Sequence, residues 1–379
     1  MSNLQAPFRY DYVGSFLRPA ELKKARAAYE AGSITAQQLK KTEDACIIEL
    51  VAKQKAAGYH VITDGEFRRS TWHLDFMWGF DGIGHHATQT GLPFHGEDAM
   101  IDDTFLTGKI RLTGEHPFVE YFRFVKALED EDTVAKQTMP SPAQMLAQFW
   151  MPFSRPGTEP YYASAAELAD DIAAGYAAVL RQLYDAGCRI VQLDDCTWGM
   201  MADKVGHVLY GTTPEGLLEA QKLHKDLNNA VIAAAPEGMI INTHVCRGNF
   251  HSTYASTGAY DPVADILFGQ ENVNAYYLEF DDERSGGFAP LAKVSGDKKV
   301  VLGLITTKFP KLEDKETVIR RIYEAAQYIP LDRLYLSPQC GFASCEIGNK
   351  LTEDQQWAKL SLVKEIAEEV WGLQKDNLR

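Results

Sequence analysis

The stretch Asp185-Ala-Gly-Cys-Arg-Ile-Val-Gln-Leu-Asp-Asp (185–195) contains the repeating unit of the fold. Ala186 and Gly187 end a helical segment, because glycine readily adopts the left-handed conformation that stops a helix. The apolar run that begins at Ile190 then predicts a short buried strand. Asp194 and Asp195 follow, so this strand ends in two carboxylates.

The same unit recurs along the chain as short apolar strands that alternate with long amphipathic helices. Several helices begin at a capping residue such as Thr213 or Thr352, and Ala57-Gly58 repeats the glycine stop. The predicted strands are 12–15, 61–64, 134–139, 190–194, 239–243, 275–279, 300–305 and 334–337. The predicted helices include 35–57, 165–187, 213–235, 315–328 and 352–373.

Eight strands in this alternation predict an α/β protein, a (β/α)8 TIM barrel that forms a single catalytic domain over 1–379. A doubly wound sheet is the alternative, since periodicity and length do not distinguish a closed sheet from an open one. No Gly-x-Gly-x-x-Gly follows the first strand, which removes the best indication of a dinucleotide fold. Residues 73–110 interrupt the alternation and predict a hairpin inserted after the second strand, where insertions often cover an active face.

The composition is typical of a soluble globular protein, with 45% apolar and 24% charged residues. The net charge of −14 argues against nucleic acid or an anionic membrane as a partner, because both are negatively charged. No apolar run approaches the roughly 20 residues of a membrane span, and residues 1–7 lack the basic and apolar regions of a secretory signal. We therefore expect a cytoplasmic protein that binds small molecules. The oligomeric state is left open.

Scarce, chemically versatile residues stand at the ends of three predicted strands. His244 and Cys246 form a His-x-Cys pair after the fifth strand, Glu279 ends the sixth, and Cys340 follows the eighth. In a barrel these strand ends meet around one mouth. One nitrogen, two sulfurs and one oxygen make up a tetrahedral zinc shell, so we predict Zn²⁺ at these four residues.

The spread of these ligands favours a catalytic metal over a structural one. Taken singly, each residue is more often inert, and structural zinc usually uses local pairs such as Cys-x-x-Cys. A free thiol has a pKa near 8.5, and zinc removes its proton while keeping the sulfur nucleophilic. A shell rich in thiolate suits a metal that carries a nucleophilic sulfur better than one that polarises a carbonyl.

The ligand set on a barrel resembles the catalytic half of the cobalamin-independent methionine synthase family. Three further motifs extend the resemblance over almost the whole chain: Val13-Gly-Ser15 resembles Ile-Gly-Ser, Gly65-Glu66-Phe67 resembles Gly-Glu-Phe, and Gln192-Leu-Asp194-Asp195 resembles Gln-Ile-Asp-Glu. The resemblance implies that Ser15 lies near the homocysteine carboxylate. It also implies that Glu66 and Asp194 bind the homocysteine ammonium.

The chain departs from that family where the methyl donor is concerned. The family's methyl-transfer histidine aligns with Lys308, which could donate a proton or orient an anion, and whose alternative is a solvated lysine. The family's Asp-Glu-Pro becomes Asp194-Asp195-Cys196, its Arg-Cys folate segment is not found around 109–115, and its N-terminal barrel is not in the sequence. The thiol acceptor is therefore better supported than a polyglutamyl folate donor.

Two further residues are predicted to support substrate binding. Arg18 could pair with an acid group of a substrate or donor, with a surface arginine as the alternative. Trp198 could offer a stacking face to a planar donor, with a packed rim aromatic as the alternative.

Taken together, the residues and the resemblance imply a zinc-dependent methyltransferase that forms methionine from homocysteine. One candidate donor is 5-methyltetrahydrofolate. The alternatives are zinc-dependent alkylation of another thiol, such as coenzyme M by an epoxide, and a non-catalytic zinc-stabilised binding protein. Glu66 and Asp194 favour an amino-acid thiol, because a sulfonate thiol carries no ammonium.

Overall fold

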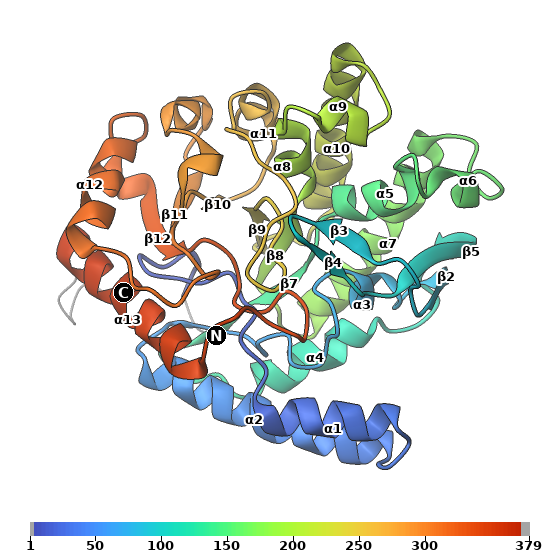
Figure 1. Cartoon of the computed structure of the whole chain (residues 1–379), viewed down its shortest axis with the longest axis horizontal. Helices are drawn as coiled ribbons and strands as arrows, with labels where there is room; N and C mark the ends of the chain where they lie inside the picture. The colour runs from blue at the N-terminus through green and yellow to red at the C-terminus, as the bar shows by residue number, and fades with distance from the viewer. Residues whose placement is uncertain (1–3, 373–379) are drawn as a thin grey trace.

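A six-stranded parallel sheet lies at the centre of the computed structural model, which describes residues 4–372 (Figure 1). The strands lie in the order β12-β11-β10-β9-β8-β7. Their bounds are β7 Gln137–Pro140, β8 Ile190–Asp195, β9 Ile240–Val245, β10 Ala275–Glu279, β11 Lys299–Ile305 and β12 Leu334–Pro338. Nearly every strand residue is buried, as in parallel sheets that are covered on both faces. The fold is therefore mixed α/β, as the alternation predicts.

The five long predicted helices are confirmed, and they lie around the outside of the strands (Figure 1). They are α2 Ala36–Ala56, α7 Ala165–Asp185, α10 Pro214–Ala234, α12 Lys315–Ala325 and α13 Glu353–Trp371. Each begins at a Ser, Thr or Asp whose side chain accepts a hydrogen bond from a backbone amide of the first turn. The predicted glycine stops are also confirmed, with φ of 85° at Gly58 and 95° at Gly187. Residue 373, the predicted end of the last helix, lies outside the described residues.

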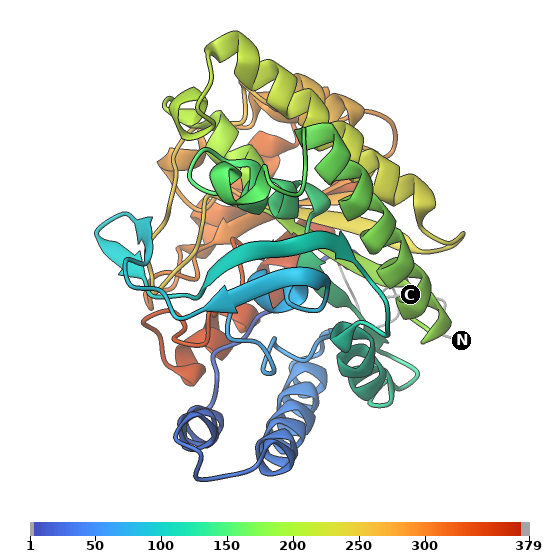
Figure 2. The ribbon, with the colours of Figure 1, turned by 90° about the vertical axis from the view of Figure 1, so that its right-hand side faces the viewer.

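Two antiparallel strand pairs follow β1 (Val61–Ile62) and precede β6 (Val134–Ala135) in the sequence. Strands β1 and β6 themselves pair in parallel. The long pair joins β2 (Asp81–His86) to β5 (Asp103–Arg111), and Figure 2 shows it as a ribbon across the molecule. The short pair joins β3 (Leu92–Phe94) to β4 (Glu97–Ala99) at the end of that ribbon. The remaining α-helices are α1 Ala20–Glu30, α3 Leu74–Met77, α4 Pro117–Lys126, α5 Pro142–Trp150, α6 Arg155–Thr158, α8 Thr197–Ala202, α9 Gly206–Leu209 and α11 Ala264–Gln270.

The first predicted strand, 12–15, does not form a regular strand. One parallel bridge joins Tyr10 to Leu336. Beyond it, the backbone carbonyls of this segment accept hydrogen bonds from side chains. Lys136 Nζ donates to Tyr12 O at 2.5 Å, and Gln192 Nε2 donates to Val13 O at 2.9 Å. These donors replace the amides of a neighbouring strand, which explains why the apolar pattern of this segment overestimates its sheet pairing.

None of the helices in the described part of the chain is long and apolar enough to cross a membrane.

A buried carboxyl outside the sheet makes folding stability depend on pH. Glu271 is fully buried, and its Oε1 accepts a hydrogen bond from Asn228 Nδ2 at 2.7 Å. Burial, followed by the charge of Asp195, raises the pKa of Glu271 from an ordinary 4.5 to about 8. Between pH 4.5 and about 8, Glu271 is therefore protonated in the folded state and ionised in the unfolded state.

We expect the free energy of unfolding to fall as the pH rises from about 5 to 8, by at most about 1.4 kcal/mol per pH unit from this group. Its contribution is complete below pH 4.5 and lost above pH 8. Glu271→Gln should remove that dependence, so its stability relative to the native chain should increase with pH in urea unfolding. Glu237→Gln, at an exposed position, is the control. Equal pH dependence in all three proteins would contradict the assignment.

Candidate metal centre and cavity

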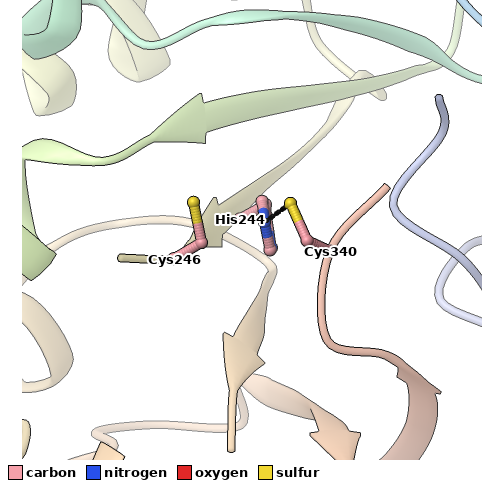
Figure 3. Close-up of side chains that lie close together, drawn as sticks. All are labelled: His244, Cys246 and Cys340. Atoms are coloured by element: carbon pink, nitrogen blue, oxygen red, sulfur yellow. Dashed lines mark hydrogen bonds between the residues drawn. The ribbon is translucent and has the colours of Figure 1, made fainter. Parts of the chain in front are cut away.

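Three predicted metal ligands meet at the carboxyl ends of two strands (Figure 3). His244 lies on β9, Cys246 follows that strand, and Cys340 follows β12. The three side chains are buried, and their ligand atoms all lie within 4.8 Å of one another. Figure 3 shows the imidazole between the two thiols, with His244 Nε2 3.4 Å from Cys340 Sγ.

The hydrogen bonds around these residues prepare them for a metal ion. His244 Nδ1 lies 3.0 Å from Tyr277 O, and a carbonyl can only accept. The proton therefore resides on Nδ1, and the Nε2 lone pair faces the sulfurs, as in histidines that bind zinc. Hydrogen bonds with Cys196 and then Cys340 are the main reasons why the pKa of Cys246 lies well below its usual range. One imidazole nitrogen and two sulfurs fit a soft-ligand metal such as zinc.

Glu279, the fourth predicted ligand, lies outside this group of three. Its carboxylate is fully buried, and Oε2 accepts a hydrogen bond from the Arg247 amide at 2.7 Å. Its Oε1 lies 3.0 Å from Arg284 Nη2 and 3.3 Å from Lys308 Nζ. The structure thus surrounds Glu279 with positive charge at the end of β10.

Lys308 is a buried ion-pair residue, neither solvated nor facing the cavity. Its Nζ also lies 3.4 Å from Asp281 Oδ2, and its side chain is 2% exposed. Burial alone would lower the pKa of Lys308, but the carboxylates of Glu279 and Asp281 raise it. The ammonium is therefore held by the two carboxylates of Glu279 and Asp281.

The three candidate metal ligands line a cavity whose empty space, counted together with its opening to solvent, is about 870 Å³. Three of the predicted substrate residues, Ser15, Glu66 and Asp194, line it together with the His–Cys–Cys group. Trp72, His73 and residues of the β3–β4 hairpin form another part of the wall. The predicted acceptor site and the predicted metal site therefore share one chamber.

Glu66 lines this cavity, and one of its carboxylate oxygens has no hydrogen-bond partner in the described part of the chain. Its Oε1 accepts from Thr138 Oγ1 at 3.0 Å, whereas Oε2 is buried without a hydrogen-bond partner within residues 4–372. The backbone there is left-handed, with φ of 65° at Gly65 and 63° at Glu66, an uncommon conformation for a glutamate. Burial raises the pKa of Glu66, and it raises the pKa of Asp194 to about 7. Two desolvated carboxyls of this kind suit a cationic ligand group.

Comparison with known proteins assigns the chain to a family. The model described as "Cobalamin-independent synthase, Catalytic domain" matches residues 155–368, more than half of the chain. The chain belongs to this cobalamin-independent synthase family. Within it, the Bacillus subtilis protein YxjG, described only as uncharacterized, is 42% identical over 96% of this chain and 95% of its own length.

Solved structures show the same fold over nearly the whole length of this synthase-family chain. A protein from Listeria monocytogenes, provisionally named a vitamin-B12-independent methionine synthase, is 39% identical with a TM-score of 0.77, covering 98% of this chain and all of the other. A B12-independent methionine synthase from Shewanella sp. W3-18-1, solved with selenomethionine, has a TM-score of 0.71 over 97% and 98% of the two chains. It is 18% identical, so that likeness concerns the fold alone.

Two predicted substrate residues of this synthase-family chain lie away from the cavity. Arg18 is buried, and its guanidinium donates to the carbonyls of Phe16, Glu66, Arg69 and Ala343. Trp198, on α8, is fully buried and does not line the cavity. Arg18 therefore cross-links loops, and Trp198 packs in the core, because tertiary contacts turn both side chains away from the chamber.

Cys196 is a functional candidate that the sequence analysis did not select. Its Sγ lies 3.2 Å from Cys246 Sγ, and it lines the cavity. The available signal was its position directly after the aspartates that end β8. A third thiol therefore adjoins the candidate metal group.

Proposed function

We propose that this chain is a zinc-dependent methyltransferase that transfers a methyl group to the thiol of homocysteine and so forms methionine. The observation that carries the proposal is one cavity lined both by the His244–Cys246–Cys340 group and by Glu66, whose Oε2 has no hydrogen-bond partner in the described part of the chain. The first element suits a thiol and the second an ammonium. Homocysteine carries both groups at opposite ends of a short chain.

His244 Nε2, Cys246 Sγ and Cys340 Sγ would hold the zinc ion. Glu279 Oε2 accepts one hydrogen bond and so retains a lone pair, which keeps Glu279 as the fourth proposed ligand. Zinc bound there would lower the pKa of a substrate thiol and keep its sulfur nucleophilic near neutral pH. The Tyr277 carbonyl holds the imidazole orientation that this binding needs.

The acceptor is oriented by polar groups of the same cavity wall. Glu66 Oε2 and the Asp194 carboxyl accept hydrogen bonds from the ammonium, and its positive charge offsets the cost of burying them. The Ser15 hydroxyl accepts from the Ala343 amide at 3.4 Å, so its own proton remains available to a carboxylate. Fixing both ends of the amino acid aims its sulfur and excludes water from the reacting atoms.

We also infer that the parallel strands close into a (β/α)8 barrel over a single catalytic domain, with 73–110 inserted after β1. The bridge between Tyr10 and Leu336 supports this, because it joins the N-terminal segment to β12. On the other side, Phe16 N donates to Gly65 O at 3.1 Å, just beyond β1, and β1 pairs with β6. Closure brings all strand ends around one mouth, which is where the proposed site lies.

The proposed function is tested by supplying homocysteine to the zinc-loaded protein with a panel of methyl donors and measuring methionine by mass spectrometry. Coenzyme M and 4-mercaptobutyrate serve as acceptors without an ammonium. We expect homocysteine to be the preferred acceptor, because only it can engage both Glu66 and Asp194. Equal methylation of the three thiols, or protein that binds no zinc, would contradict the proposal.

Lys308 is proposed to position Glu279, and its replacement tests that role. Lys308→Met is expected to lower the free energy of unfolding by about 3 kcal/mol, because it leaves buried carboxylates with one cation fewer. Lys308→Arg, which keeps the charge, should restore most of the stability and zinc content in urea unfolding and metal analysis. A Met variant that is as stable as the native chain but has lost methyl transfer would instead indicate a direct catalytic role.

A further inference from the structure

Two aromatic residues of the cavity wall lie beside the loops that follow Cys340 and Cys246. The Trp72 amide donates to Ser344 O at 2.8 Å, which places this tryptophan beside the loop that follows Cys340. Phe94 packs against the loop that follows Cys246, because a β-carbon at Gly248 would lie only 3.2 Å from Phe94 Cε1. Both rings line the cavity. An indole, stacked on His73, and a phenyl ring therefore belong to the same cavity wall as the His–Cys–Cys group.

The hairpin that carries Phe94 is held in place by polar contacts outside the cavity. The His95 amide donates to Tyr254 O at 2.8 Å, and Thr253 Oγ1 donates to His95 O at 2.6 Å. Glu97 pairs with His251 at 2.8 Å and with Lys350 at 2.7 Å. The β3–β4 hairpin thus reaches the site as a preorganised wall, which reduces the entropy lost on binding a ligand.

Two lining residues of the cavity, Glu66 and Gln144, carry buried acceptor oxygens, Oε2 and Oε1 respectively, without hydrogen-bond partners in the described part of the chain. The one arginine among the lining residues, Arg247, is fully buried, and its Nε and Nη2 donate to the carbonyl of Gly258. Burial lowers the pKa of His73 to about 3, so this imidazole is neutral. The lining therefore combines carboxyl, amide and aromatic surfaces that favour positive charge.

We propose that the methyl donor is a small onium cation, a sulfonium or a quaternary ammonium, whose charged methyl-bearing atom lies between Trp72 and Phe94. This inference rests on the proposed function, since it names the donor of the same reaction. Aromatic rings attract a cation whose methyl groups leave it no hydrogen to donate. Because the acceptor ammonium occupies Glu66 and Asp194, the rings stabilise the second charge.

The reaction balances without a proton for the leaving group. The thiolate electron pair of homocysteine forms the new S–CH₃ bond, and the old S–CH₃ or N–CH₃ bond breaks with its pair passing to the donor atom. A sulfonium thus leaves as a neutral thioether and an ammonium as a neutral amine. Lys308, held between Glu279 and Asp281, is not needed as an acid. The thiolate loses its negative charge, and the onium donor loses its positive charge. A cavity that excludes water favours this neutralisation.

The test combines turnover and equilibrium binding on the zinc-loaded full-length protein. Turnover with homocysteine compares S-methylmethionine and glycine betaine, which distinguish sulfonium from ammonium, with 5-methyltetrahydrofolate and methylcobalamin. Binding of trimethylsulfonium is measured by calorimetry against tert-butanol, a neutral molecule with three methyl groups and similar size, in the native chain and in Trp72→Phe and Trp72→Leu. We expect an onium donor to be used best. We also expect Trp72→Leu to weaken trimethylsulfonium binding roughly 5- to 10-fold, with Trp72→Phe closer to the native chain and zinc content unchanged.

Each outcome supports or overturns the proposal. Faster turnover with either onium donor, together with a selective loss of trimethylsulfonium binding in Trp72→Leu, supports it. Methionine formed faster from 5-methyltetrahydrofolate or methylcobalamin overturns the onium donor and leaves the proposed function intact. If no donor methylates homocysteine, the proposed function fails. The binding arm then decides separately, and equal affinities for trimethylsulfonium and tert-butanol overturn the onium site.

Discussion

Replacing Cys246 with serine is expected to abolish zinc retention and to reduce methionine formation by more than about 100-fold. Removing a residue that only orients a metal ligand already lowers metal affinity or activity by about 10- to 100-fold, so the loss of a ligand itself should lower them further. Hydrogen bonds with Cys196, Cys340 and His244 lower the pKa of the Cys246 thiol, which favours the thiolate that a metal ion binds. A serine hydroxyl does not ionise near neutral pH and is a poor ligand for a soft metal.

Zinc content after dialysis and methionine yield are the two measurements for this variant. Cys46→Ser is the matched control, because Cys46 is a buried cysteine on α2 and does not line the cavity. Cys340→Ser should behave like Cys246→Ser. If Cys246→Ser keeps both zinc and activity, the metal centre is not where we place it.

The strand-end residues could be predicted because the chain itself marks where strands stop. An apolar run followed by His244 and Cys246 places those side chains at a carboxyl end, and parallel strands bring such ends together. The register confirms this, since His244 lies opposite Tyr277 on β10 and Asp194 on β8. The same reasoning located Cys340 near the imidazole without any knowledge of the intervening loops.

The direction of a long side chain could not be predicted in the same way. Arg18 and Lys308 stand within motifs beside the site, yet one satisfies four carbonyls and the other two carboxylates. Their partners come from loops whose paths depend on tertiary packing. Trp198 turns into the core for the same reason, whereas Trp72 lines the cavity from a segment without regular alternation. Cys196 was missed because a lone cysteine shows no pairing until the strands assemble.

Glu66→Gln is expected to raise the KM for homocysteine by about 10- to 100-fold, which corresponds to losing one charge-assisted hydrogen bond of about 1.5–3 kcal/mol. The amide keeps the size of the side chain and can still accept from Thr138. It removes the negative charge at Oε2, the oxygen that has no partner in the part of the chain described. Asp194→Asn should act in the same direction, and the double variant should be less than additive, because both side chains serve one ammonium.

The thiol 4-mercaptobutyrate makes this prediction specific, because it lacks the ammonium and keeps the carboxylate. Glu66→Gln should leave the methylation of 4-mercaptobutyrate unchanged. The preference for homocysteine over 4-mercaptobutyrate should therefore be smaller in the variant than in the native protein. The free energy of unfolding of Glu66→Gln should rise, whereas its affinity for homocysteine should fall. Burial raises the pKa of Glu66 even though Arg69 Nη1 lies 3.4 Å from its Oε1 and acts to lower it, so ionising this carboxyl at pH 8 has a net cost to folding, and the neutral amide should raise the free energy of unfolding. A variant that is more stable but binds homocysteine more weakly would show that Glu66 is retained for substrate binding. A loss of both properties would show that it holds the loop instead.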